Sequence, residues 1–274
     1  MTKLFNLDKQ KSSLIREDLG GYQQYKSVEV DTHPQPFPNK GREKQAFTLA
    51  EVLITLAIIG VVAAMTIPTL VSNYQEKVTV TKVKKIYTTL ANAYQLYIND
   101  NGEPGDFNYD EEGAVKSYKI FEPYLKIAKD CGTLSGDGCM YTSLYLLKNG
   151  DNAAYYADSN LYYKILLADG ASLWVRGHAI NTTMPETNSY LSILYDVNGT
   201  AGPNKWGYDL FDFRAYVNKG ILPVGVVEND YSFEEYCAPQ NSKGYGCTAW
   251  VIHKGNMDYL KCDDLTWADS RCSD

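Results

Sequence analysis

The sequence predicts an α+β fold in which one long N-terminal helix packs on a C-terminal antiparallel sheet. Three observations lead to this prediction. A nearly uncharged segment runs directly into a segment with helical periodicity, the rest of the chain holds short apolar runs separated by turn residues, and all the cysteines follow the uncharged segment. The chain then divides into residues 1–46, a helix over 47–101 and a head over 102–274.

The first part of the helix, residues 47–71, is predicted to be embedded in a membrane. Its only ionisable side chain is that of Glu51, and most of the other residues are Leu, Ile, Val and Ala. About 20 such residues are enough for a helix to cross a bilayer. Basic residues both precede and follow the segment, so the charges alone leave its orientation open.

The second part of the helix, residues 72–101, is predicted to be amphipathic and to end at Asn99–Gly102. Pro68 lacks a backbone N–H, which predicts a kink or local break, and the hydroxyl of Thr66 or Thr69 is expected to help satisfy the freed carbonyls. Apolar and tyrosine side chains spaced by three and four residues form one helix face, which we expect to pack on the head: Val83, Ile86, Tyr87, Leu90, Ala93, Tyr94 and Tyr97.

The cysteines indicate disulfide bonds made in an oxidising compartment, because their number is even and all follow the apolar segment. This places the head outside the cytoplasm. Of the fifteen possible connectivities, the short spacings permit three local pairs, 131–139, 237–247 and 262–272. A zinc site is the alternative, but no Cys-x-x-Cys motif is present. The six cysteines are Cys131, Cys139, Cys237, Cys247, Cys262 and Cys272.

The composition does not indicate nucleic-acid binding or catalysis. The net charge is −7, whereas phosphate binding needs clustered Lys and Arg. The histidines are scattered at His33, His178 and His253, and the chain has neither a Gly-x-Ser-x-Gly motif nor a phosphate-binding loop. We therefore expect a protein that is not an enzyme, with each histidine on the surface or in a loop.

The carboxylate of Glu51 has a simple local explanation. Thr48 as N-cap and Glu51 three residues later form the pattern of a capping box, which satisfies free N–H groups where a helix begins. That explanation does not account for the abrupt change at Gln45–Ala46, where a polar tail gives way to Phe-Thr-Leu-x-Glu.

The segment AFTLAEVLITLAIIGVVAAMTIPTL resembles the N-terminal signature of type IV prepilins and of the pseudopilins of type II secretion. The resemblance implies that a prepilin peptidase cleaves between Ala46 and Phe47, removes residues 1–46 and methylates the new amine. Glu51 is then the hallmark glutamate, and Gly60 and Pro68 match helix-softening positions. The residue before the cut is usually Gly, so Ala46 implies slower or variant processing.

The same resemblance implies a structural filament subunit in the inner membrane, with one membrane pass and its head in the periplasm or outside the cell. The implied partners are the peptidase, other pilin or pseudopilin subunits and an inner-membrane assembly platform. In the filament, the amine of Phe47 on one subunit would lie beside Glu51 of its neighbour. A secretion pseudopilus, a pilus and a DNA-uptake filament remain open, as do abundant and minor subunits.

Other interpretations of the apolar segment also remain open. A secretory signal peptide cut before Met65 has small residues at Val62 and Ala64, but its polar leader would be unusually long. A membrane-anchored or secreted binding protein could use the helix as an anchor or signal only. An anchored hydrolase is a third alternative without a recognisable catalytic constellation.

The head is predicted to be one α+β unit. Residues 114–128 are helical as far as Pro123 allows, two apolar runs around Asp169–Gly170 predict a tight hairpin, and residues 190–196 predict a strand. Residues 220–227 and 248–253 are weaker strand candidates.

A glycine-punctuated segment, residues 196–213, carries the oxygen-bearing side chains of Asp196, Asn198, Asn204 and Asp209. Such a composition suits Ca²⁺, although the spacing is not that of an EF-hand. Some major pseudopilins bind calcium in a head loop, so the resemblance supports this ligand set. Turn formation alone is the alternative explanation.

Overall fold

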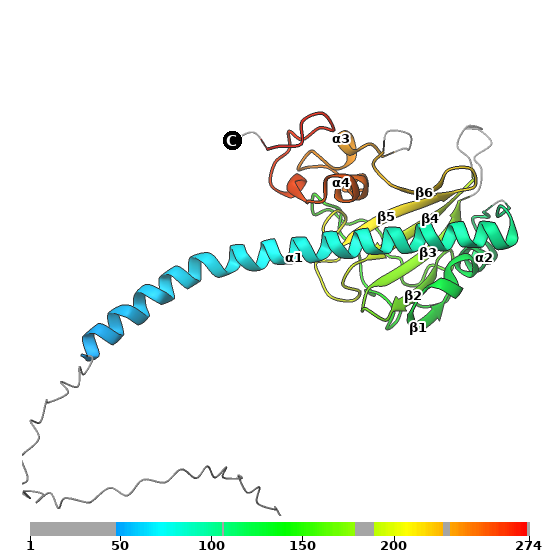
Figure 1. The fold of residues 1–274 in the computed structure, drawn as a ribbon. Helices are drawn as coiled ribbons and strands as arrows, with labels where there is room; N and C mark the ends of the chain where they lie inside the picture. The colour runs from blue at the N-terminus through cyan, green and yellow to red at the C-terminus, as the bar shows by residue number, and fades with distance from the viewer. Residues whose placement is uncertain (1–47, 106, 179–188, 227–230, 273–274) are drawn as a thin grey trace, which may run out of the picture. The chain divides into compact units, whose positions relative to one another are not determined.

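The computed structural model describes residues 48–105, 107–178, 189–226 and 231–272 (Figure 1). The chain divides into two units, residues 1–53 and 54–274. The helices are α1 (Leu49–Asn101), α2 (Glu111–Phe121), α3 (Phe233–Tyr236) and α4 (Cys247–Lys254), with short 3₁₀ helices η1 (Glu122–Tyr124) and η2 (Asp258–Leu260). The strands are β1 (Ile127–Gly132), β2 (Tyr163–Leu167), β3 (Ser172–His178), β4 (Tyr190–Asp196), β5 (Leu210–Tyr216) and β6 (Gly220–Pro223).

The strands form one antiparallel sheet in the order β1-β2-β3-β4-β5-β6, so every strand pairs with its neighbours in sequence. This confirms the predicted fold class. The expected hairpin is β2–β3, which turns at Asp169–Gly170, and the strand predicted at 190–196 is β4.

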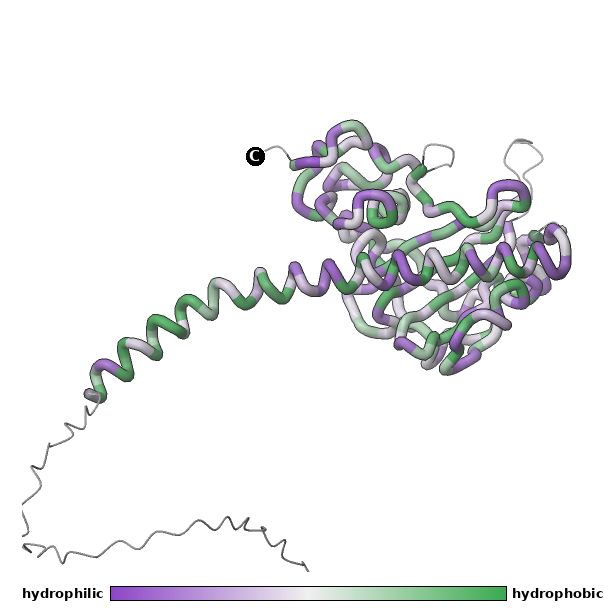
Figure 2. The backbone as a smooth tube through the Cα atoms, in the orientation of Figure 1, coloured by the Kyte–Doolittle hydropathy of each residue, from purple (hydrophilic) through white to green (hydrophobic). Residues whose placement is uncertain are grey.

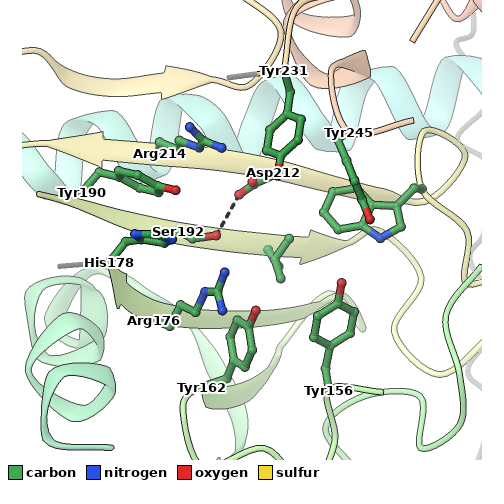
Figure 3. Close-up of a pocket in the computed structure, with 12 residues that line it drawn as sticks. Tyr156, Tyr162, Arg176, His178, Tyr190, Ser192, Asp212, Arg214, Tyr231 and Tyr245 are labelled. Carbon is green, nitrogen blue, oxygen red and sulfur yellow. Dashed lines mark hydrogen bonds between the residues drawn. The ribbon is translucent and has the colours of Figure 1, made fainter. Parts of the chain in front are cut away.

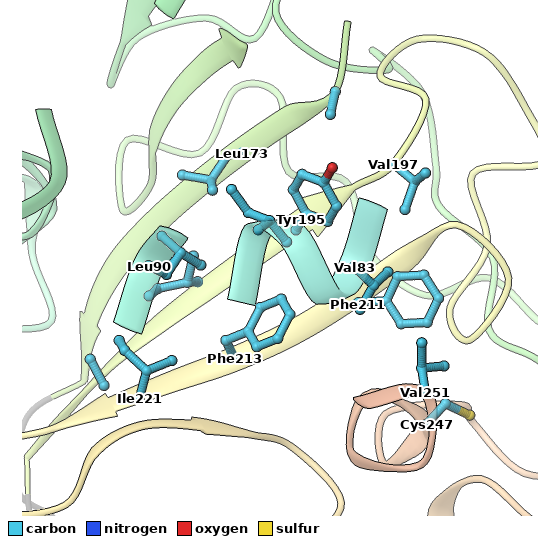
Figure 4. Packing of buried hydrophobic residues seen from close by; sticks show 14 of the residues in the cluster. Val83, Leu90, Leu173, Tyr195, Val197, Phe211, Phe213, Ile221, Cys247 and Val251 are labelled. Atoms are coloured by element: carbon cyan, nitrogen blue, oxygen red, sulfur yellow. The ribbon is translucent and has the colours of Figure 1, made fainter. Parts of the chain in front are cut away.

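The main core lies between one face of the sheet and the C-terminal half of α1 (Figure 4). Side chains at every second position of β3, β4 and β5 point to this face, as a strand's alternation requires. From the helix side, Val83 and Leu90 are fully buried against them. The sheet residues at this contact include Leu173, Tyr195, Phe211, Phe213 and Ile221.

The predicted amphipathic face of α1 is confirmed. Val83, Ile86, Leu90, Ala93 and Tyr94 are buried, and Tyr87 and Tyr97 are partly buried against the same core. The helix ends at Asn101 because Gly102 adopts a left-handed conformation, with φ of 81°, and returns its N–H to the carbonyl of Ile98.

A second, smaller core lies on the other face of the sheet. Trp174, Leu194 and Leu210 point to this face, and the segment between β1 and β2 covers them with aromatic side chains such as Tyr145 and Tyr156. Helix α2 contacts β2 and β3, and α4 contacts β5 and β6.

Three disulfide bonds join the local pairs Cys131–Cys139, Cys237–Cys247 and Cys262–Cys272. The second of these links α3 to α4 within the main core, where both cysteines are fully buried. The third fixes the last described residues to the segment that follows η2.

Several local expectations were wrong. Residues 248–253 form most of helix α4 rather than a strand, because a short apolar run does not distinguish the two and the left-handed Gly255 ends the segment as a helix. Strand β5 begins inside the glycine-punctuated segment 196–213, where no strand was predicted, and β1 was not predicted either. His178 is not in a loop but ends β3, stacked on Tyr190 with ring centroids 4.5 Å apart.

Candidate functional site

The N-terminal half of α1 is a run of mostly apolar residues (Figure 2), and their side chains are exposed. The helix is long and apolar enough to cross a membrane by length and composition, and its most apolar window is not buried anywhere in the described structure. Exposed apolar surface on this scale marks a membrane or protein contact. The largest side chains include Leu53, Ile54, Leu56, Ile58, Ile59, Val61, Met65, Ile67 and Leu70.

Glu51 forms a complete capping box with Thr48. The Thr48 N–H donates to Oε2 of Glu51 at 2.9 Å, and the Glu51 N–H donates to Oγ1 of Thr48 at 3.2 Å. The Thr48 hydroxyl also donates to the same carboxylate oxygen, at 2.9 Å. The local explanation of Glu51 is therefore realised in the single chain, and the carboxylate is exposed at the start of the helix.

The structure gives less support to the roles predicted for the other residues of this segment. Ala46 and Phe47 lie outside the described residues. The helix continues through Pro68 without the expected local break, and a side chain at Gly60 would meet nothing within 4 Å. Thr66 donates to the carbonyl of Val62 at 3.0 Å, which is not the carbonyl that the missing N–H of Pro68 leaves free.

Polar contacts that sequence analysis missed fix α1 to the head. The ammonium of Lys82 donates to the carbonyl of Val197 at 2.8 Å, and the hydroxyl of Tyr94 donates to the carbonyl of Tyr216 at 3.1 Å. Glu76 accepts from the N–H of Met257 and pairs with Lys261, each at 2.9 Å. Only the tyrosine spacing could have indicated one of these contacts.

The loop that follows β4 gathers the two predicted carboxylates in the interior. Asp196 is fully buried and Asp209 nearly so. The Asp196 carboxylate accepts from the Tyr145 hydroxyl at 2.9 Å and from the N–H groups of Asn198 and Gly199. Burial, together with a smaller effect of the nearby Asp209 charge, raises the pKa of Asp196 to about 8.

Asp209 closes the other side of this loop. Its carboxylate accepts from the N–H groups of Asn204 and Lys205, at 2.8 and 2.6 Å, and burial raises its pKa. The loop turns through Gly199 and Asn204, which have φ of 70° and 53°, and a side chain at Gly199 would meet the carbonyl of Gly170 at 2.4 Å.

The two asparagines of this loop each retain one buried oxygen without a hydrogen bond. These are Oδ1 of Asn198 and Oδ1 of Asn204. Two buried carboxylates and two such amide oxygens in one loop match the oxygen donors that Ca²⁺ takes. Among the described residues, no group of three or more His, Cys, Asp or Glu could hold a metal ion, so amide oxygens would have to complete the set.

The sequence comparisons agree with the geometry of α1. The model of the prokaryotic N-terminal methylation motif matches residues 41–67, and a model described as a family of unknown function, DUF6613, matches residues 69–254. Type II secretion system core protein G of Vibrio cholerae serotype O1 is 29% identical over 125 residues, covering 36% of this chain and 85% of that protein. The chain belongs to DUF6613, and the methylation motif and the Vibrio relative support its assignment to the type IV prepilins and pseudopilins.

As a prepilin-like protein, the chain combines the family's two parts, an N-terminal apolar helix and an α+β head. It is a pilin-like subunit, and the pilins and pseudopilins that it is similar to are structural proteins rather than enzymes. No solved structure matches the chain significantly.

Proposed function

We propose that the chain is cleaved before Phe47 and assembles through α1 into a filament whose heads lie outside the cytoplasm. The observation that carries this proposal is the coincidence of the methylation motif with a helix half that has no apolar partner in the described chain. Copies of the same helix, packed side by side, would cover that surface. The disulfides support a head in an oxidising compartment.

Processing would complete a charge pair that one chain lacks. Cleavage creates an amine at Phe47, and a neighbouring subunit would present its Glu51 carboxylate to it. A charge buried beside lipid is costly, about 2.5–3.5 kcal/mol on insertion scales, so the pair sets the register between subunits. Before assembly, the hydrogen bonds from Thr48 hold the Glu51 carboxylate at the start of the helix.

Mass spectrometry of the protein isolated from its host tests the processing step. We expect a mature chain that begins at Phe47 with a methylated amine. A chain that retains residues 1–46, or one that begins at Met65, would contradict the proposal and favour an anchor or a signal peptide. Co-sedimentation with filaments then separates a subunit from a membrane-anchored binding protein.

Among the possible filaments, we propose a type II secretion pseudopilus. The supporting observation is the similarity to a core protein of that system in Vibrio cholerae. Deletion of the chain should cause exported proteins to accumulate in the periplasm while surface pili and DNA uptake stay normal. Normal secretion together with lost pili or lost uptake would assign the chain to one of the other filaments.

We further propose that the loop over residues 196–209 binds Ca²⁺ through Asp196, Asn198, Asn204 and Asp209. The ion would neutralise the two buried carboxylates, and the two amide oxygens that have no hydrogen bond would coordinate it. Millimolar Ca²⁺ should raise the melting temperature of the wild type and of Asp263→Ala, whose aspartate is exposed, but not that of Asp196→Ala. An unchanged wild-type melting temperature would refute the site.

A further inference from the structure

A cavity of about 180 Å³ lies on the face of the sheet opposite α1 (Figure 3). Its volume is similar to that of an engineered cavity of ~150 Å³ that holds a benzene ring. The floor is a row of three residues paired across adjacent strands, Arg176 of β3, Ser192 of β4 and Arg214 of β5. Neighbouring strands lie about 4.8 Å apart, so the two arginines flank the serine.

Aromatic side chains form the walls. The guanidinium of Arg176 lies 4.9 Å from the ring centre of Tyr162, and that of Arg214 lies 4.5 Å from the ring centre of Tyr190 and 5.3 Å from that of Tyr231. These cation–π contacts orient both guanidinium groups.

The described residues that line the cavity carry two arginines and one carboxylate. Among the described lining residues Asp212 is the only carboxylate, and it already accepts from the Ser192 hydroxyl at 3.1 Å. It faces Arg214, whose charge opposes the effect of burial on the pKa of Asp212, which is raised to about 6. Arg176 forms no ion pair with any carboxylate in the described parts of the chain, and its Nε is buried without a hydrogen bond.

Many of the polar groups that line the cavity are hydrogen-bond donors. Two guanidinium groups, tyrosine hydroxyls and the indole N–H of the buried Trp206 offer donors, and the Trp206 N–H has no hydrogen-bond partner among the described residues. A ligand that suits this cavity therefore brings acceptors and a negative charge, and its body is flat enough to lie among aromatic rings.

We propose that this cavity binds a small ring-bearing carboxylate, with the carboxylate over Ser192 between the two arginines and the ring among the tyrosines. This chemistry has two sources, an acidic sugar such as a uronic acid and an aromatic acid. The proposal rests on the head alone and is independent of processing, filament assembly and calcium.

Isothermal titration of the full chain in detergent with glucuronate, benzoate and glucose tests the proposal. We expect millimolar or tighter binding of at least one of the two acids and at least tenfold weaker binding of glucose. Binding of glucuronate alone identifies an acidic sugar, and binding of benzoate alone identifies an aromatic acid. Failure of both acids to bind, or equally tight binding of glucose, would overturn the proposal.

Variants separate recognition from structural support. Arg176→Gln should weaken binding of the acid at least tenfold, Arg176→Lys should restore part of it, and Arg271→Gln, which makes the same change at an exposed site, should have no effect. Asp212→Asn should tighten binding, because it removes the competing carboxylate. If Arg176→Gln does not fold, the lysine and asparagine variants decide, and unchanged affinity in both refutes the proposal.

Discussion

At the scale of single residues, the head holds carboxylates under conditions that disfavour their charge. Asp196 lies in the interior beside Asp209, and burial raises its pKa to about 8. Between pH 4 and 8, the folded chain therefore binds more protons at this site than the unfolded chain does. The contribution to stability is fully present below about pH 4 and is lost as the pH rises through the folded-state pKa.

The free energy of unfolding without calcium should fall by a few kcal/mol as the pH rises from about 4 to about 8. Asp196→Asn keeps the size of the side chain and removes its titration, so its stability should vary less over that range. Urea titrations in a chelator at several pH values measure both curves. Parallel curves for the two proteins would show that Asp196 does not titrate there.

Glu51→Ala should still insert and be processed, but it should assemble poorly because the register charge is missing. The substitution also removes the capping box, whose loss costs about 0.5–2 kcal/mol. Thr48→Ala removes the cap and keeps the carboxylate, which makes it the matched control. Sedimentation of filaments should show a defect in the first variant only, and an equal defect in both would assign Glu51 to capping.

At the scale of elements, the C-terminal half of α1 packs on one face of the sheet. Leu90 is fully buried in the main core, whereas Leu96 on the same helix is 46% exposed. The helix half before residue 72 has no such contacts, since its apolar side chains are exposed. Along one continuous helix, the apolar first half is therefore exposed and the apolar face of the amphipathic second half is buried.

Leu90→Ala should lower the free energy of unfolding by about 2–5 kcal/mol, because it leaves a cavity between helix and sheet. Leu96→Ala should change it by less than about 0.5 kcal/mol. Urea unfolding of the full chain in detergent, followed by tryptophan fluorescence, compares the two. Similar losses would mean that α1 does not pack on the sheet as described.

Two disulfides offer a controlled comparison, because both close loops of sequence separation 10. Chain entropy predicts equal contributions from equal loops, but Cys237 and Cys247 are fully buried while Cys262 and Cys272 are half-buried. Replacing the first pair by alanine should cost about 2–4 kcal/mol, and replacing the second should cost less. Equal losses of stability for the two variants, measured by thermal unfolding, would show that burial in the core does not increase the stabilisation by a disulfide.

At the scale of the whole molecule, the sequence predicts those features of the fold that depend on residues close together in the chain. The stripe from Val83 to Tyr97, the helix end at Gly102 and the turn at Asp169–Gly170 follow from spacing and turn chemistry. The chain gives no such signal for the cavity, because Arg176, Ser192 and Arg214 are far apart in sequence and meet only through strand pairing. Helix α4 was missed because a short apolar run does not distinguish a helix from a strand.

The contacts between α1 and the head also determine how the subunit carries mechanical load. Near one end of the buried half of the helix, Glu76 meets Lys261 and Lys82 meets the carbonyl of Val197, and further along Tyr94 meets the carbonyl of Tyr216. A pull along α1 therefore enters the sheet at both ends of β4 and β5. The loop after β4 is in the first path, so stiffening that loop would resist shear between helix and sheet.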